Sequence, residues 1–420
     1  MAASGGSTGP LADASEMATE LAGGSNTACI EEKQQRKTVA APAGPAAPMI
    51  TSTPPLPHPL PAPGKRRRIG KVAATAKDPR RKLPTVVKPK DAYTAESVSS
   101  PGDKALVRDA ARSVVRVSVI AHDGKLITQC TGICIGWKET GKCARILTSS
   151  SVVRALDPKS KLHICLPNRT ILEGQLLFFN QHYDIALLEI SSESDLPLQT
   201  PSFGSNPNYG QEVFMLGRGE ESNLEARHGK ILWFEDADDL VCNYRLFLSC
   251  EPPKGCTGGS VIDNDGNVTG MAFDSGGSYV GILSISTIHT CIEMWMKFSR
   301  IARPIHGLSL RTVELLDVSL QEVISLEHNI SKGYIVDMVD IGSTAEKLGI
   351  RYGDVIVSFD GLSVQTLPQL EDYLLSLGWG FLQGNTGSSS TVDLKLEVYD
   401  LLERGTRSIT LAVEFCGAPE

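Results

Sequence analysis

The chain has 420 residues, 41% of them hydrophobic and 21% charged, and a formal net charge of −7. This length leaves room for two or three domains, and the composition is ordinary for a globular protein. A negative chain does not predict nucleic-acid binding, and no apolar run approaches the ~20 residues that cross a bilayer, so no membrane partner is expected. The ten cysteines form no Cys-x-x-Cys pair and are expected to be buried rather than paired in disulfides. No motif indicates a metal or a cofactor.

Residues 1–104 are rich in Ala, Gly, Ser, Thr and Pro, which predicts a disordered arm because such a composition buries too little apolar surface to offset chain entropy. Two basic clusters in this arm resemble a bipartite nuclear import signal. They are formed by Lys65, Arg66, Arg67 and Arg68 and, after a spacer, by Arg80, Arg81 and Lys82. The alternative is a solvated basic linker that attracts polyanions weakly. We expect an import receptor as a partner and a nuclear location, with the cytoplasm as the alternative.

The N-terminus predicts neither a secretory signal nor a transit peptide. It lacks the basic start and apolar core of a secretory signal. Acidic residues lie where a transit peptide is poor in acid, which argues against a chloroplast location; they are Asp13, Glu16, Glu20, Glu31 and Glu32.

Residues 105–300 are predicted to form a domain of many short β-strands. Ser113–Ile120 is β-branched and partly alternating, a pattern typical of a strand. Further strands are expected at residues 129–137, 144–148, 162–166, 171–179, 184–190, 212–216, 230–234, 246–250, 261–262, 268–273 and 279–285. Turn residues between them indicate an all-β barrel or sandwich. Apolar residues at helical spacing over 288–298 predict a closing helix.

Residues 301–420 are predicted to form a second unit that mixes strands and helices. Strands are expected at residues 333–339, 353–359, 392–399 and 408–415, and a helix at residues 367–377. Ser343 is placed to cap a short helix that Gly349 ends. Asp360-Gly361 predicts a tight turn, and the Gly- and Ser-rich residues 378–390 predict a loop.

Three motifs, in this order, resemble the catalytic regions of the HtrA/Deg family of trypsin-like proteases. Residues 146–153 read Ile-Leu-Thr-Ser-Ser-Ser-Val-Val, where the family has Ile-Leu-Thr-x-x-His-Val-Val. Residues 184–188 read Asp-Ile-Ala-Leu-Leu, like the family's aspartate motif, and residues 255–259 read Gly-Cys-Thr-Gly-Gly, like its Gly-x-Ser-Gly-Gly serine loop. The chain from Gly333 to Gly361 resembles a PDZ domain through Gly-Tyr-Ile-Val, Gly-Ser-Thr-Ala-Glu-Lys-Leu-Gly and Gly-Asp-Val-Ile.

This resemblance covers residues 105–415 and implies a mostly β fold. A trypsin-like double β-barrel is expected at residues 105–300, and an α+β PDZ-like domain at residues 301–420, behind the disordered arm at residues 1–104.

Two of the three catalytic positions depart from the family. Ser151 occupies the histidine's position and Thr257 that of the serine nucleophile, while Asp184 keeps the family's aspartate. In the triad, histidine takes the nucleophile's proton and passes it to the leaving amine. A serine hydroxyl can do neither near pH 7, and the extra methyl of threonine restricts χ1. The resemblance therefore implies a degenerate triad without useful peptide hydrolysis.

Other residues are candidates for the missing groups. His182 and His163 are either displaced bases or ordinary surface or packing histidines. Cys256 is a candidate thiol nucleophile, but its side chain is expected to point away from the oxyanion donors and to be buried and inert. The N–H groups of Gly255 and Thr257 form either an anion-binding notch or a turn that satisfies local carbonyl groups.

PDZ domains bind peptide C-termini by adding a strand to a sheet edge and holding the carboxylate with backbone N–H groups. In HtrA-type units this cradle lies at the start of the domain, where the best match is Ile305, His306, Gly307 and Leu308. Polypeptides or protein C-termini are therefore the expected partners. The alternative is a spacer that packs on the barrel, and the loop at residues 378–390 is a candidate cover for the groove.

The motifs lead to one expected function and two alternatives. We expect a catalytically inactive protease homologue that binds polypeptides as a scaffold or regulator, with a homo-trimer as the family-like assembly. The first alternative is an active serine-type endopeptidase that uses Thr257 with a displaced base. The second is a chromatin- or RNA-associated adaptor whose basic arm carries the binding.

Overall fold

The computed structural model describes residue 80, residues 83–85, residue 87 and residues 91–137, 142–192, 195–232, 244–274, 280–362, 366–384 and 391–415. Of the predicted import signal, Lys65, Arg66, Arg67, Arg68, Arg81 and Lys82 lie outside these described residues, whereas Arg80 is described and exposed. Residues 89–420 form one unit, which the following paragraphs describe. Among the described helices, none has the length and apolar character that a membrane span requires.

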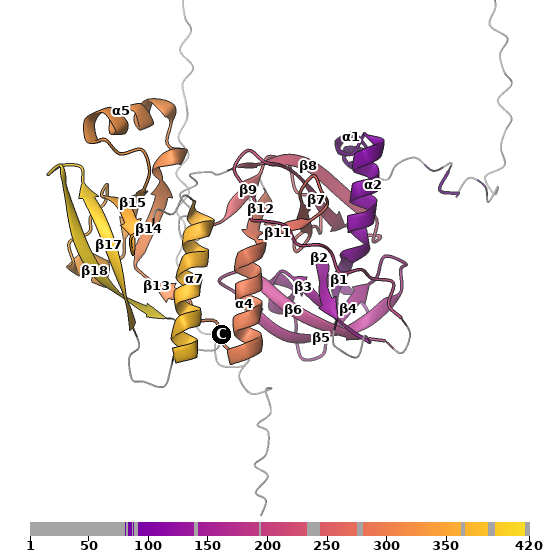
Figure 1. Ribbon diagram of the computed structural model, residues 1–420. Coiled ribbons are helices and arrows are strands. Elements are labelled where there is room, and N and C mark those ends of the chain that lie inside the picture. The colour runs from indigo at the N-terminus through magenta and orange to yellow at the C-terminus, as the bar shows by residue number, and fades with distance from the viewer. Residues whose placement is uncertain are drawn as a thin grey trace, which may run out of the picture. The chain divides into compact units, whose positions relative to one another are not determined.

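The first barrel closes six strands in the order β1-β2-β3-β6-β5-β4 (Figure 1). The strands are β1 (Val114–Ile120), β2 (Leu126–Trp137), β3 (Cys143–Thr148), β4 (Lys161–Cys165), β5 (Ile171–Asn180) and β6 (Ile185–Ser191), and helix α3 (Ser151–Arg154) follows β3. Alternate β1 side chains, Val115, Val117 and Val119, are fully buried in the interior, as the period of two of a strand requires.

The second barrel closes six strands in the order β10-β11-β12-β9-β8-β7. The strands are β7 (Glu212–Arg218), β8 (Leu224–Leu232), β9 (Leu246–Leu248), β10 (Ser260–Ile262), β11 (Val268–Asp274) and β12 (Val280–Ser284). Helix α4 (Ile285–Phe298) follows, and the Ser284 hydroxyl caps it by accepting from Thr287 N. The predicted double barrel is confirmed. β8 begins earlier than predicted, because its polar residues pair with all of β7.

The N-terminal boundary of the barrel domain lies earlier than residue 105. Helices α1 (Ala92–Ser97) and α2 (Pro101–Ala110), and the 3-10 turn η2 (Ala111–Ser113), precede β1. Thr94 Oγ1 donates to the Ala226 carbonyl of β8 and accepts from its N–H. The prediction of disorder for residues 1–104 is therefore wrong from Asp91 onward, because tertiary contacts stabilise helices that composition alone does not favour.

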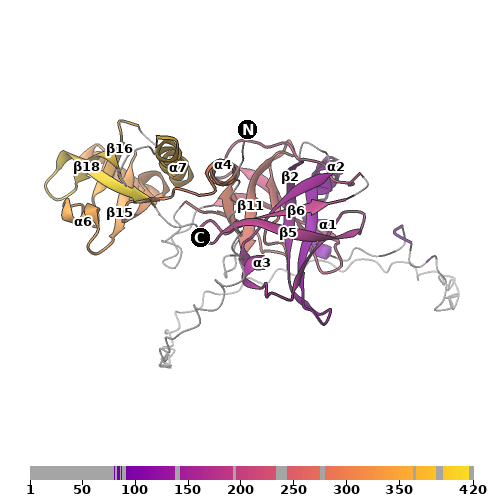
Figure 2. The same cartoon turned by 90° about the horizontal axis from the view of Figure 1, so that it is seen from below.

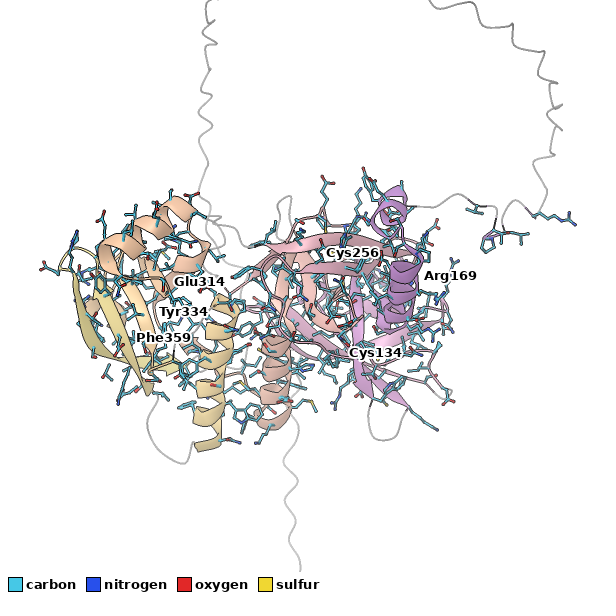
Figure 3. All side chains as sticks on the ribbon, turned by 45° about the horizontal axis from the view of Figure 1, so that its top comes forward. Cys134, Arg169, Cys256, Glu314, Tyr334 and Phe359 are labelled. Carbon is cyan, nitrogen blue, oxygen red and sulfur yellow. The ribbon has the colours of Figure 1, made fainter. Side chains whose placement is uncertain are left out.

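The C-terminal unit is a six-stranded sheet in the order β13-β18-β17-β16-β15-β14. Its strands are β13 (Pro304–Ile305), β14 (Leu308–Thr312), β15 (Tyr334–Val339), β16 (Val355–Phe359), β17 (Thr391–Asp400) and β18 (Gly405–Phe415). Its helices are η4 (Val313–Leu315), α5 (Val318–His328), α6 (Thr344–Lys347) and α7 (Leu367–Gly384). Tyr334 and Phe359 meet edge to face in its core, with ring centroids 5.5 Å apart (Figure 3).

The predicted loop at residues 378–390 is wrong for its first half, because α7 continues to Gly384. The Trp379 ring meets Phe298 of α4 edge to face at 5.4 Å, and Lys297 Nζ lies 5.0 Å from the Trp379 ring centroid. Gly378 permits a close approach to the segment after α4, since a Cβ there would lie 2.1 Å from the Ala302 carbonyl oxygen. Packing against α4 thus overrides the low helix propensity of these glycines.

Helix α7 lies beside α4 in both ribbon views (Figures 1 and 2). Its acidic residues also accept hydrogen bonds from the barrel domain. Tyr183 Oη donates to Glu371 Oε1 at 2.5 Å, and both residues are buried. Asp372 accepts from Thr287 Oγ1 at 2.7 Å and from Ser286 Oγ.

Candidate functional site

The three triad positions lie on separate segments at the barrel ends. Ser151 begins α3, directly after β3, and Asp184 directly precedes β6. Thr257 is half-buried in the loop before β10. Because β3 pairs with β6, the chain brings Ser151 and Asp184 close together, as the family resemblance implies.

The Asp184 carboxylate is bonded by two serine hydroxyls. Ser150 Oγ donates to Oδ1 at 2.6 Å, and Ser149 Oγ donates to Oδ2 at 2.9 Å. Ser149 Oγ also lies 2.9 Å from Ser151 Oγ. Since a hydroxyl carries one proton, Ser149 donates either to the carboxylate or to Ser151, and not to both at once. Asp184 therefore accepts from serine hydroxyls, where the aspartate of a triad accepts from an imidazole.

The Thr257 loop packs against the first barrel. Thr131 Oγ1 donates to Gly255 O at 2.9 Å, and Thr131 N donates to Thr257 O at 2.8 Å. Gly258 has a φ of +82°, and a Cβ there would lie 2.2 Å from Thr131 O and 3.1 Å from Ser149 N. This close approach places the nucleophile loop beside the Ser149–Asp184 cluster, and it explains why glycine stands at position 258.

Some N–H groups of this loop donate hydrogen bonds within the protein, and others do not. Cys256 N donates to Pro253 O and Gly258 N to Ala272 O. Within the described part of the chain, the N–H groups of Gly255 and Thr257 have no hydrogen-bond partner. These are the two predicted oxyanion donors, and neither of them satisfies a carbonyl group of the turn.

Neither candidate histidine bonds to Thr257. His182 Nε2 lies 3.0 Å from Tyr244 Oη, and burial, with the Arg303 and Arg245 cations, lowers the pKa of His182 to about 3. His163 lies on β4, opposite Ser118 and Glu173. Across the described residues, no hydrogen bond joins the Thr257 hydroxyl to an imidazole nitrogen.

Cys256 belongs to the buried core cluster of the second barrel, which confirms the predicted burial of its thiol. Its side chain is buried, and a Cβ on Gly217 would lie 2.1 Å from Cys256 Sγ. Burial raises the pKa of this thiol well above its usual range. Such a thiol stays protonated and does not attack as a thiolate.

The predicted carboxylate cradle lies between β13 and β14. Ile305 ends β13, Leu308 begins β14, and Gly307 between them has a φ of +69°. In the described sheet β14 is an edge strand, with β15 as its neighbour on one side. A pocket of about 260 Å³ adjoins the cradle and is lined by Arg303, Pro304, Ile305, His306, Gly307, Leu308, Ser309, Met338, Asp340, Tyr244 and Glu371.

Sequence reasoning missed several of these residues. Ser149 and Ser150 occupy variable positions of the family motif, so the motif assigns them no role. Their position next to Ser151 is the one feature of the sequence that indicates them. Tyr244 and Glu371 reach the cradle pocket from distant parts of the chain, so no local pattern indicates them.

Known families match both domains. The model of the trypsin-like peptidase domain matches residues 130–271, and the model of the PDZ domain matches residues 335–378. The Do-like 14 protein of Arabidopsis thaliana is 28% identical over 60% of this chain and 58% of its own length. The serine protease Do-like HtrA of Bacillus subtilis is 25% identical over 56% of this chain and 55% of its own length. The chain thus spans little more than half the length of these relatives.

Among solved structures, the HtrA-type protease AlgW with a tripeptide is 16% identical, with a TM-score of 0.49, over 75% of this chain and 97% of that one. The serine endoprotease from Yersinia pestis is 15% identical, with a TM-score of 0.44, over 76% of this chain and 100% of that one. By the two family models, this chain contains a trypsin-like peptidase domain followed by a PDZ domain, and it is similar in sequence to HtrA/Do-like serine proteases.

Proposed function

We propose that this protein is a catalytically inactive HtrA/Do-like homologue that binds polypeptides as a scaffold or regulator. The observation that carries the proposal is the missing proton acceptor. Ser151 stands in the histidine's place, and in the described part of the chain no imidazole bonds to the Thr257 hydroxyl. Without histidine, a protease of this type retains only a residual ~10³–10⁴-fold acceleration from its oxyanion hole and substrate binding.

Polypeptide binding is supported by the PDZ domain. The match to the PDZ model covers residues 335–378, and β14 offers an edge for an added strand. One solved HtrA-type relative is described with a bound tripeptide.

A fluorophosphonate probe tests inactivity directly, because it labels only an activated hydroxyl. The wild-type protein should remain unlabelled and should not cleave casein. The matched positive control is the double variant Ser151→His with Thr257→Ser, which supplies the base and the nucleophile. With Asp184 and the oxyanion N–H groups in place, this variant should hydrolyse casein measurably.

Labelling of wild-type Thr257, lost in Thr257→Ala, would overturn inactivity. A folded double variant without activity would show instead that the site has changed beyond these two positions.

The alternative is an active serine-type endopeptidase with Thr257 as nucleophile. Two observations favour it: Asp184 is retained, and the N–H groups of Gly255 and Thr257 are free to bind an oxyanion in the described chain. It requires a base that moves to Thr257 on substrate binding. The probe and the casein assay decide between the two functions.

We also propose that the basic arm directs nuclear import through residues 65–68 and 80–82. A fluorescent-protein fusion should enter the nucleus, and replacement of both clusters by alanine should leave it in the cytoplasm. An adaptor for chromatin or RNA is the alternative, and in that case deletion of residues 65–90 should abolish polyanion binding.

We also propose a homo-trimer, the assembly that the family resemblance implies, and sedimentation velocity measures the mass of the assembly in solution.

A further inference from the structure

A large pocket opens on the barrel domain beside α1, and we call it the α1 pocket. Its volume is about 1230 Å³. Its walls come from residues 91–97, from residues 220–227 between β7 and β8, and from residues 250–254 before the Thr257 loop. Helix α1 lies beside β8 at this place (Figure 1). Among the described residues, none lines both the α1 pocket and the pocket beside the PDZ cradle.

Acidic side chains dominate the lining of the α1 pocket. Two cations, Arg227 and Lys254, line it together with six carboxylates, those of Asp91, Glu96, Glu220, Glu221, Glu225 and Glu251. Asp91 is matched to Arg227, with Oδ2 and Nη1 2.6 Å apart. In the described part of the chain, no ion pair joins Glu96, Glu225 or Glu251 to a cation. The α1 pocket therefore carries a surplus of negative charge.

The carboxyl group of Glu225 shows that these acidic groups crowd one another. Burial raises its pKa, and the nearby charges of Asp91 and Glu220 raise it further, while the Arg227 cation acts in the opposite direction. A second cation close to Glu225 would relieve this repulsion and favour the ionised carboxylate.

Arg227 shows how this lining holds a guanidinium group. Its Nη1 donates to Asp91 Oδ2 at 2.6 Å and to Thr94 Oγ1 at 3.2 Å, and its Cζ lies 5.3 Å from the centroid of the Tyr93 ring. Carboxylates and aromatic faces are the partners that suit a planar guanidinium. The other carboxylates of the pocket, with the apolar side chain of Leu224 for an aliphatic stem, offer similar partners to the arginines of a second molecule.

The spread of the carboxylates decides which kind of cation fits. They come from three separate segments of the chain. Among the described residues, no group of three or more His, Cys, Asp or Glu side chains is arranged to hold a metal ion. A ligand that reaches several of these carboxylates at once must therefore carry several positive charges along an extended chain. A basic polypeptide segment has this character, whereas a nucleic acid has the opposite charge.

We propose that the α1 pocket binds an arginine-rich segment of a partner polypeptide, with Glu96, Glu225 and Glu251 as its ion-pair partners. Residues 89–420 carry 42 acidic and 28 basic residues, a balance that attracts a cationic partner over a long range. The inference goes beyond the proposed function, because it places a second polypeptide-binding surface on the barrel domain, apart from the PDZ cradle.

Two fluorescein-labelled decapeptides provide the test with the full-length protein. One peptide alternates arginine and serine, and in the other citrulline, a neutral isostere, replaces every arginine. Both end in an amide, so neither offers the carboxylate that a PDZ domain holds. Fluorescence polarisation in about 0.15 M salt measures Kd. The wild type should bind the arginine peptide at least about tenfold more tightly than the citrulline peptide, the effect of several exposed ion pairs.

The triple variant Glu96→Gln, Glu225→Gln and Glu251→Gln should weaken binding of the arginine peptide about tenfold and leave binding of the citrulline peptide unchanged. If the triple variant does not fold, Glu251→Lys serves as the second variant, because Glu251 is exposed and its replacement disturbs no core contact. It should also weaken binding of the arginine peptide, since it puts a like charge beside the ligand.

A matched control removes three negative charges far from the α1 pocket, on exposed positions of β17 and β18. It combines Asp393→Asn, Glu397→Gln and Glu414→Gln. Both triple variants change the net charge equally, so the difference between them reports on the pocket and not on long-range attraction. The control should change the Kd of the arginine peptide by less than about twofold.

Three results would overturn the proposal. The first is equal affinity of the wild type for the two peptides, and the second is an equal loss in the pocket variant and the control. The third is an arginine peptide that binds only after residues 65–68 and 80–82 are replaced by alanine, since the chain's own arm would then be the occupant. None of these results bears on peptide binding at the PDZ cradle, because both peptides lack a free carboxylate.

Discussion

Single residues set the shape of the Thr257 loop, and Gly258 shows how. Its left-handed backbone and its contact with Thr131 O both exclude a side chain. Gly258→Ala should destabilise the protein by at least about 2 kcal/mol, because overpacking adds to the backbone strain. Urea unfolding measures this effect. The control is Gly124→Ala, where φ is +83° but no atom lies within 4 Å of an added Cβ, so only the backbone term remains. Equal losses in the two variants would show that the contact at Gly258 is unimportant.

Burial of the His182 ring predicts how the stability of the protein depends on pH. Its pKa is lowered from the ordinary 6.5 to about 3, so above pH 6.5 the ring is neutral in both folded and unfolded protein. Below that pH the unfolded chain binds a proton that the folded protein does not, and stability is lost as the pH falls toward 3. Replacement by His182→Gln should remove this contribution.

Chemical unfolding between about pH 7 and pH 4 checks the sign of this effect. The wild type should lose more stability than His182→Gln over that interval. Because the other titrating groups are shared, they cancel in the difference. Parallel stability curves for the two proteins would contradict the assignment.

At the scale of elements, a partly buried ion pair contributes to holding α1 against the second barrel. Asp91 caps the helix by accepting from Tyr93 N and Thr94 N, and its Oδ2 lies 2.6 Å from Arg227 Nη1. The two side chains are 19% and 12% exposed, respectively. Asp91→Ala should cost about 1–3 kcal/mol, since it removes a cap and leaves the Arg227 charge with less compensation.

Hydrogen exchange of residues 92–97 reports on this element directly and should accelerate in Asp91→Ala. Asp123→Ala is the matched control, because Asp123 pairs with the exposed Lys125 at the surface. The same exchange rate in wild type and Asp91→Ala would mean that α1 is held by its other contacts, such as those of Thr94.

At the scale of the whole molecule, Asp372 joins the PDZ domain to the barrel domain. Its carboxylate accepts from Thr287 Oγ1 at 2.7 Å and from Asn206 Nδ2 at 3.0 Å. Asp372→Ala leaves these donors unsatisfied, at a cost of about 1–3 kcal/mol. We expect faster proteolysis of the linker at residues 299–303, with Asp393→Ala on the exposed face of β17 as the control. A cleavage rate equal to that of the control would show that other contacts hold the domains together.

Local patterns in the sequence were sufficient to predict most elements. Strand alternation, the Ser343 cap, whose Oγ accepts from Glu346 N, and the Asp360-Gly361 turn, with φ values of +47° and +78°, depend on neighbouring residues alone. The match of both family models agrees with the motif order read from the chain.

Only the tertiary structure decided which residues meet. It extended α7 to Gly384 through contacts with α4, and it made α1 a docked helix where composition predicted disorder. In the structure, His182 is hydrogen-bonded to Tyr244 and not to Thr257. Such contacts join residues far apart in the chain, 188 positions in the case of Tyr183 and Glu371. Their energies depend on packing and burial, which no local pattern of residue types encodes.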